Sequence, residues 1–271
     1  MKIINLSIRN SICFLSKNKE NKLADDIVRK TRHEFPAFSP SYIASYWYCT
    51  RSSRCNEKKE KAIRLMSEID KKLLECRIDT DFRLEIIEDE LGLLKATKKH
   101  KTANCIEYAQ LAEACLLANG IKNSKLAKVK IRLTILNKDT PPKKAYEHTE
   151  TFDHVIVLSS LDDENYSNNP FVLDAWIGKA MSNSEAKREY LGMLDKNDVD
   201  KIIKNGIEDY KTSTVQDSQG NTEINANNFN YRIQIFFEEM EDSFLKRKFN
   251  ENPETTTKSL RLQFSDLLLN A

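Results

Sequence analysis

Residues 102–120 read TANCIEYAQLAEACLLANG, and this stretch predicts a helix with a cysteine in its first turn. Asn104 is a favourable N-cap residue, and Glu107 follows it at the spacing of a capping box. Asn119-Gly120 is a typical helix end. Small and apolar residues recur at helical spacing and predict one buried face: Cys105, Ala109, Ala112 and Leu116.

The predicted cap makes Cys105 the first residue of this helix. Unpaired backbone N–H groups and the helix dipole favour an anion at that position. A thiolate is stabilised there, so Cys105 is a candidate nucleophile. The structural alternative is a buried cysteine in a core helix, which is a common place for a free cysteine.

Length and composition indicate a polar chain that can still bury a core, because 40% of its 271 residues are hydrophobic and 31% are charged. Residues 1–100 carry 21 Lys and Arg against 15 Asp and Glu, and the remainder carries 22 against 26. This asymmetry is too small to indicate nucleic-acid binding. No apolar run approaches the ~20 residues that span a bilayer, so we expect no membrane span.

The cysteines follow no regular spacing, and they lie at positions 13, 49, 55, 76, 105 and 115. This pattern predicts free thiols in a reducing compartment. Cys49 and Cys55 have no neighbouring histidine or second cysteine pair, so a zinc site is not expected. The first fifteen residues do not have the pattern of a secretory signal peptide.

Hydrophobic periodicity divides the chain into three parts. Residues 1–95 are predicted to be mainly helical, with Thr80 as the N-cap of a helix that continues beyond it. Residues 96–250 form an α+β part with a polar loop at about 212–230, and residues 251–271 form a C-terminal tail. After Gly120 the period changes from 3.6 to 2, which predicts strands over 129–135, 154–158, 171–176 and 231–237.

Two of these strands carry a histidine and an aspartate on either side of one polar loop. A symmetric antiparallel hairpin sets His154 directly opposite Asp174, where Cβ atoms are roughly 4.5–5.5 Å apart. A slip of one residue would separate the two side chains. The alternatives are a strand-end histidine satisfied by the backbone and an aspartate that marks a strand end. His33 and His148 lie in stretches without a clear pattern and are expected on the surface.

The order cysteine, histidine, aspartate on a helix start and two strands resembles the transglutaminase-like and papain-like cysteine enzymes, especially compact bacterial effectors. The resemblance covers about residues 95–180, and three motifs carry it: Asn104-Cys105-x-Glu107, His154-Val155-Ile156-Val157 and Leu173-Asp174-Ala175-Trp176. It implies an α+β fold in which the cysteine helix packs on a small antiparallel sheet, with N-terminal helices and extra C-terminal helices. It also implies that Cys105 is the nucleophile, His154 the base and Asp174 the orienting acid.

The sequence departs from the family after the cysteine, where many members have glycine and this chain has Ile106. No upstream glutamine is evident as an oxyanion donor, so the backbone N–H of Cys105 is the expected one. Asn104 and Trp176 are expected to contact substrate, because Asn104 precedes the nucleophile and Trp176 shares the strand face of Asp174.

The resemblance implies a cysteine-dependent acyl-transfer enzyme that deamidates or transglutaminates a protein amide, without a metal or organic cofactor. The implied partners are a protein substrate, including a host protein, and a regulatory protein. The implied location is a reducing cytosol, including the host cytoplasm after secretion by a bacterium. Two alternatives stay open: a cysteine protease of the same fold, and a catalytically inactive helical module that binds a protein through its basic N-terminal part.

Overall fold

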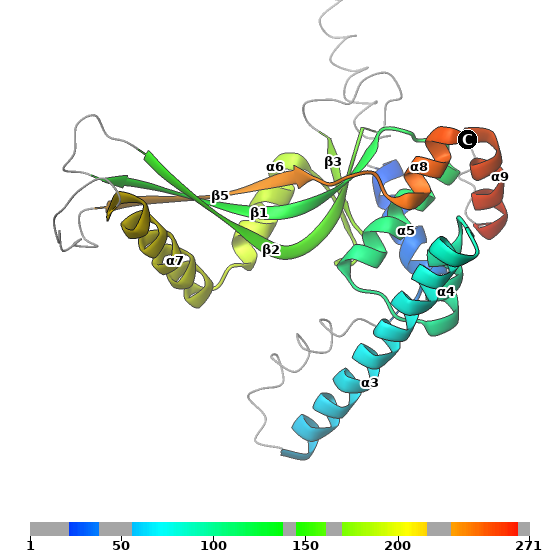
Figure 1. Ribbon diagram of the computed structural model, residues 1–271, viewed down its shortest axis with the longest axis horizontal. Coiled ribbons are helices and arrows are strands. Elements are labelled where there is room, and N and C mark those ends of the chain that lie inside the picture. Colours follow the sequence, from blue (N-terminus) through cyan, green and yellow to red (C-terminus); the bar gives the residue numbers. More distant parts are fainter. Residues whose placement is uncertain (1–21, 38–55, 138–144, 161–169, 216–228, 265–271) are drawn as a thin grey trace, which may run out of the picture. The chain divides into compact units, whose positions relative to one another are not determined.

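The structure is a computed structural model that describes residues 22–37, 56–137, 145–160, 170–215 and 229–264. It confirms the α+β class, because helices accompany a five-stranded antiparallel sheet of order β4-β3-β2-β1-β5 (Figure 1). The strands are β1 (Ser124–Asn137), β2 (Ala145–Ser159), β3 (Phe171–Asp174), β4 (Lys179–Ser182) and β5 (Phe229–Glu239).

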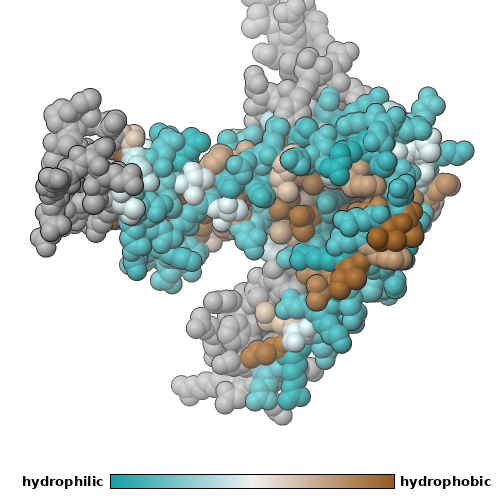
Figure 2. All heavy atoms as spheres, viewed as in Figure 1, coloured by the Kyte–Doolittle hydropathy of each residue, from teal (hydrophilic) through white to brown (hydrophobic). Residues whose placement is uncertain are grey.

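Helices and short connections make up the rest of the described chain. A helix over residues 22–34 is followed by α3 (Asn56–Asp81), the π-helix η1 (Phe82–Ile86), α4 (Gly92–His100), α5 (Cys105–Ala118), α6 (Asn183–Met193), α7 (Lys196–Val215), α8 (Phe244–Glu251) and α9 (Pro253–Gln263). None of these helices has the length and hydrophobicity of a membrane-spanning segment. Figure 2 shows hydrophobic side chains gathered over the end of α3 and η1 on an otherwise mostly hydrophilic face.

One expectation about the helices is wrong. Thr80 does not cap a new helix; it lies inside α3, and its Oγ1 donates to the carbonyl oxygen of Cys76 at 2.8 Å. The stretch from Asn56 to Ile86 contains no glycine or proline, so nothing ends the helix at Thr80. Within the predicted C-terminal tail, residues 253–263 form α9, whose Leu260 is fully buried in the core.

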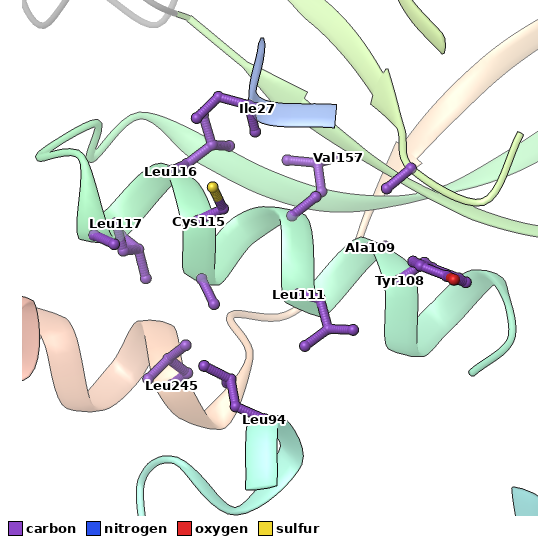
Figure 3. Packing of buried hydrophobic residues seen from close by; sticks show 14 of the residues in the cluster. Ile27, Leu94, Tyr108, Ala109, Leu111, Cys115, Leu116, Leu117, Val157 and Leu245 are labelled. Carbon is purple, nitrogen blue, oxygen red and sulfur yellow. The ribbon is translucent and has the colours of Figure 1, made fainter. Parts of the chain in front are cut away.

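The described chain divides into two compact units. The first contains the described parts of residues 1–126, 155–182 and 240–271. At its centre lies α5, and eleven of its fourteen residues are buried. Figure 3 shows residues from other elements around this helix, among them Ile27, Leu94, Val157 and Leu245. A helix that is apolar on all sides is stable only inside a core, and α5 has that position.

The second unit contains the described parts of residues 127–154 and 183–239. Its long antiparallel pair joins β1 to β5, from Ala127 opposite Glu239 to Asn137 opposite Phe229. Helix α7 approaches this sheet closely at Gly206. A Cβ atom on Gly206 would lie 2.5 Å from Cδ2 of Leu133 and 3.4 Å from Cβ of His148. Leu133 is fully buried, so its side chain has no room to move away.

We predict that Gly206→Ala lowers the free energy of unfolding by about 1–3 kcal/mol through overpacking. Gly192→Ala in α6 is the matched control, because nothing lies within 4 Å of the added Cβ. That variant should gain about 0.5–1 kcal/mol from helix propensity. Urea denaturation of both variants measures the difference. Equal stability changes for the two would contradict the close packing of α7 on β1.

Candidate active site

The start of α5 is built as the sequence predicts. Asn104 is the N-cap, and its backbone N–H donates to Oε2 of Glu107 at 2.8 Å within a capping box. Cys105 is therefore the first helical residue, and it is partly exposed to solvent. The capping box fixes the direction of the first turn, so the backbone N–H groups of this turn are held beside the thiol.

A cation lies next to this helix start. Arg77 of α3 donates from Nε to Oε1 of Glu107 at 2.6 Å, and the Glu107 side chain is only 5% exposed. The hydrogen bond that Arg77 donates to Glu107 raises the pKa of Arg77. Glu107 thus holds the guanidinium of Arg77 beside the first turn of α5, which begins with Cys105.

The other two described cysteines are poor nucleophiles because both are buried. Burial raises the pKa of the Cys76 thiol, and it raises the pKa of Cys115 to about 12. Cys105 is thus the accessible thiol among the three cysteines that the structure describes. The remaining cysteines, at positions 13, 49 and 55, lie outside the described residues.

Asp174 ends β3 and holds the turn that follows. Its Oδ1 accepts the backbone N–H groups of Trp176 and Ile177, each at 3.1 Å, and Gly178 (φ +78°) completes the turn into β4. Leu173 packs in the core cluster around α5, and side chains alternate between the two faces of a strand. The Asp174 carboxylate therefore leaves β3 on the face opposite that core.

The predicted register between β2 and β3 is wrong by two residues. The symmetric hairpin would pair Val157 with Phe171, whereas the structure pairs Val157 with Leu173 and Ser159 with Phe171. His154 is therefore not directly opposite Asp174. The shift arises because β2 runs on to Ser159 while β3 begins only at Phe171, so the connection is not centred where the sequence suggested. An even shift leaves each side chain on its predicted face.

His154 belongs to the second unit, whereas Cys105 and Asp174 belong to the first. Its ring is 5% exposed and packs edge-on against Tyr190 of α6, with ring centroids 5.6 Å apart. Phe152 lies on the same strand with its ring centroid 6.4 Å from that of His154. The approach of His154 to Cys105 stays a prediction.

Trp176 is not on a strand, so the argument that it shares a strand face with Asp174 fails. It lies in the turn between β3 and β4, where its carbonyl oxygen accepts from Nη1 of Arg32 at 3.0 Å. Its side chain packs partly buried against the α5 cluster. Of the polar loop predicted at 212–230, residues 212–215 are the end of α7, residues 229–230 begin β5, and residues 216–228 lie outside the described residues.

Sequence reasoning missed the environment of His148. This residue lies in β2, with Nδ1 2.6 Å from Oδ2 of Asp209 and Nε2 3.1 Å from Oε1 of Glu150. Asn205 of α7 donates to the same Glu150 oxygen at 2.7 Å. The even spacing of Tyr146 and Phe152 from His148 was the sequence signal for this strand, and the even-numbered residues 146–152 are the half-buried ones. Among the described residues, no group of three or more His, Cys, Asp or Glu is arranged to hold a metal ion.

A second missed cluster is closed to solvent and fixes α8 on α5. Ser243, the N-cap of α8, donates to Oε2 of Glu113 at 2.6 Å, and Ser124 donates to Oε1 at 3.4 Å. Lys246 donates to Ser124 at 3.4 Å and to the carbonyl oxygen of Lys122. Burial raises the pKa of Glu113 and lowers the pKa of Lys246. Because these groups satisfy one another inside the core, we assign the cluster a structural role.

Comparison with known proteins found no matching family model, no similar curated protein and no similar solved structure. The functional argument therefore uses only the residues of this chain.

We predict a pH-dependent effect of Glu113→Gln. Burial raises the folded-state pKa of Glu113 above its ordinary value of 4.5. The stability that it contributes is therefore fully present below the unfolded-state pKa and is lost as the pH rises through the folded-state pKa. The glutamine does not titrate, so the variant should gain stability relative to wild type as pH rises from about 4 to about 8. Urea denaturation across this range measures the gain, and exposed Glu254→Gln serves as the control. Parallel curves for Glu113→Gln and wild type would contradict the assignment.

We also predict that Cys105 reacts with iodoacetamide at least about tenfold faster than Cys76 or Cys115 at neutral pH, because Cys105 is the accessible one of these three described cysteines. Arg77→Gln should slow this reaction by about two- to fivefold, since a partly exposed charge contributes ~0.5–1 kcal/mol. Arg64→Gln, an exposed arginine on the same helix, is the control. Peptide mass mapping after timed alkylation gives the rates. An unchanged alkylation rate in Arg77→Gln would show that the Arg77 guanidinium does not affect the reactivity of Cys105.

Proposed function

We propose that this protein is a cysteine-dependent acyl-transfer enzyme that acts on a side-chain amide of a protein. The observation that supports this proposal is the accessible thiol of Cys105 at the first residue of a capped, buried helix, with the Arg77 guanidinium nearby. The papain-like or transglutaminase-like arrangement of Cys105, His154 and Asp174 is part of the proposal. A reducing cytosol, including that of a host cell, is the proposed location because the thiol must stay reduced.

In the proposed reaction, the Cys105 thiolate attacks the carbonyl carbon of a glutamine or asparagine side chain. The negative charge develops on the amide oxygen, which accepts the backbone N–H of Cys105. Protonated His154 gives its proton to the leaving amine, so ammonia departs and a thioester forms. Water then yields a carboxylate, or a primary amine yields a new amide, and either step regenerates the thiol.

The proposal places a different geometric requirement on each of the two residues that act with Cys105. His154 must bring one ring nitrogen within hydrogen-bond reach of the sulfur. Asp174 must serve two purposes, because Oδ1 already accepts two backbone N–H groups of the turn. In the proposal, the carboxylate of Asp174 must both hold this turn and orient the imidazole of His154. This double role makes Asp174→Asn a better test than alanine, because asparagine keeps an oxygen acceptor for the turn.

Side-chain amide chemistry is preferred over peptide-bond cleavage because of the size of the sheet. A protease binds an extended backbone in a long groove, whereas a deamidase needs a slot for one side chain. Among the described residues, the strands of the first unit are short: β3 and β4 have four residues each, and they lie with the end of β2 and the first residues of β1. Water is the abundant acceptor, so deamidation is the proposed default outcome.

We predict that incubation with a protein substrate raises its intact mass by about one unit per amide, or incorporates an added primary amine through the thioester. Cys105→Ala and His154→Ala should each abolish the change, and the double variant should be no worse than either. Asp174→Asn should reduce the rate by roughly 10²–10⁴-fold while the protein stays folded. His33→Ala, with an 83% exposed side chain, is the control and should be fully active.

Other outcomes of this experiment replace the proposal. Discrete cleavage fragments that depend on Cys105 would make the protein a cysteine protease. Amide chemistry that persists in Cys105→Ala would exclude Cys105 as the nucleophile. A protein that modifies none of a broad set of substrates, such as a whole-cell lysate analysed by mass spectrometry, would instead be a binding module.

A further inference from the structure

The end of α3 and the adjoining η1 expose an unusual number of large apolar side chains. Five of them form what we call the α3–η1 stripe: Leu74, Ile78, Phe82, Ile86 and Ile87, with exposed fractions of 59%, 60%, 52%, 68% and 53%. The first four recur every four residues, so they follow one side of the helix. Figure 2 shows hydrophobic side chains gathered in this region. Single exposed apolar residues are common, whereas a contiguous stripe indicates an interaction surface.

The opposite face of α3 packs against the rest of the protein. Ile69, Leu73 and Cys76 are buried on that side, where α3 packs on α4. The stripe is therefore a second apolar face on a helix whose core face is satisfied. Core formation accounts for the buried residues and leaves the stripe unexplained.

The local backbone holds the stripe in place. The chain passes through the π-helix η1, in which no residue is buried, and then through Glu88 in a left-handed conformation (φ 49°). Asp89 fixes this bend, because its carboxylate accepts the N–H of Leu91 at 3.2 Å and pairs with Lys95 at 2.8 Å. A Cβ on Gly92 would lie 2.7 Å from Cβ of Arg83, so only glycine permits this close packing of η1 on α4. The exposed residues of η1 are thus displayed on a well-anchored bend.

Acidic residues surround the stripe. Glu75, Asp81, Glu85 and Glu88 are all exposed, and none of them forms an ion pair with another described residue. The exposed cations beside the stripe are Lys71 and Lys72, just before Leu74, and Arg77, which is paired with Glu107. The surface therefore combines an apolar strip with a negatively charged border.

We propose that the α3–η1 stripe binds a basic amphipathic helix of a partner protein. The apolar face of such a helix would cover the stripe, and its flanking Lys or Arg residues would meet the acidic border. The thirteen residues from Leu74 to Ile86 extend about 18 Å along the helix axis, which matches about three turns of a partner helix. Binding at this site is separate from the chemistry of Cys105.

Charge argues against two other occupants. A second copy of this chain, packed antiparallel about Ile78, would set Glu75 of one copy against Asp81 of the other, and like charges across an interface disfavour pairing. An anionic bilayer surface would repel the same acidic border. A basic partner is attracted by the acidic border instead of being repelled by it.

The test uses two synthetic helical peptides that share leucines at four-residue spacing. One peptide has lysines beside the leucines, and the other has glutamates at the same positions. Fluorescence anisotropy with the full chain should show micromolar binding of the lysine peptide and at least tenfold weaker binding of the glutamate peptide. Ile78→Glu and Ile86→Glu should each weaken binding of the lysine peptide at least tenfold. Neither change should unfold the protein, because both side chains are exposed.

Matched variants complete the experiment. Leu262→Glu changes an isolated exposed leucine (71%) on α9 and should leave binding unchanged, as should Cys105→Ala. The double variant Asp81→Lys/Glu85→Lys should reverse the preference between the two peptides. Equal binding of both peptides, no binding of either, or full binding by Ile78→Glu would overturn the proposal. If the wild-type chain forms a concentration-dependent dimer that Ile78→Glu abolishes, the stripe is a dimer interface and the proposal is overturned. If the wild-type chain binds anionic vesicles and Ile78→Glu does not, the stripe binds a membrane and the proposal is likewise overturned.

Discussion

The burial of α5 on every side is the constraint on which the first unit depends. A helix inside a core must satisfy every polar group that it carries, and α5 carries two buried carboxylates, Glu107 and Glu113. An unpaired buried charge costs several kcal/mol, so each carboxylate needs partners. Glu107 accepts hydrogen bonds from the N–H of Asn104 and the guanidinium of Arg77. Glu113 accepts hydrogen bonds from the hydroxyls of Ser124 and Ser243. These partners attach α3, β1 and the start of α8 to the central helix.

The same constraint determines where the candidate nucleophile lies. A buried helix reaches solvent only near its ends, and Cys105 is at the end that the capping box fixes. The acid that completes the capping box also binds Arg77, so one residue, Glu107, both starts the helix and places a cation near the thiol. Stability and the proposed chemistry therefore share Glu107, and a change there would affect both.

The local features of the fold could be predicted from the sequence, because short-range patterns produce them. The capping box follows from Asn104 and Glu107, and the period-2 pattern predicted β1 and the core of β2. Features that depend on distant partners could not be predicted. The α5 pattern suggested a single buried face, yet Leu111 and Leu117 outside that face are also fully buried because α4, α8 and α9 cover them.

The candidate site shows the same division. Cys105 lies where the sequence placed it, since its position depends on three neighbouring residues. The pairing of β2 with β3 depends on where each strand ends, and the two-residue shift changed the predicted partner of Asp174. His148 was expected on the surface. Its partner Asp209 lies on α7, far along the chain, so no local sequence pattern indicated the pair. The η1 bend has no recognisable sequence signal, since it results from packing at Gly92.

The most direct test of the proposed site is a disulfide trap between Cys105 and a cysteine at position 154. A disulfide requires Cα atoms about 4.4–6.8 Å apart, so it reports whether residue 154 lies beside the nucleophile. After mild oxidation of His154→Cys, the account predicts a peptide that links positions 105 and 154, with a mass loss of about two units from disulfide formation. Val155→Cys, the next residue of β2 on the other strand face, should remain unlinked. A free thiol at position 154, or a link from position 155 instead, would contradict the proposed pairing of Cys105 with His154.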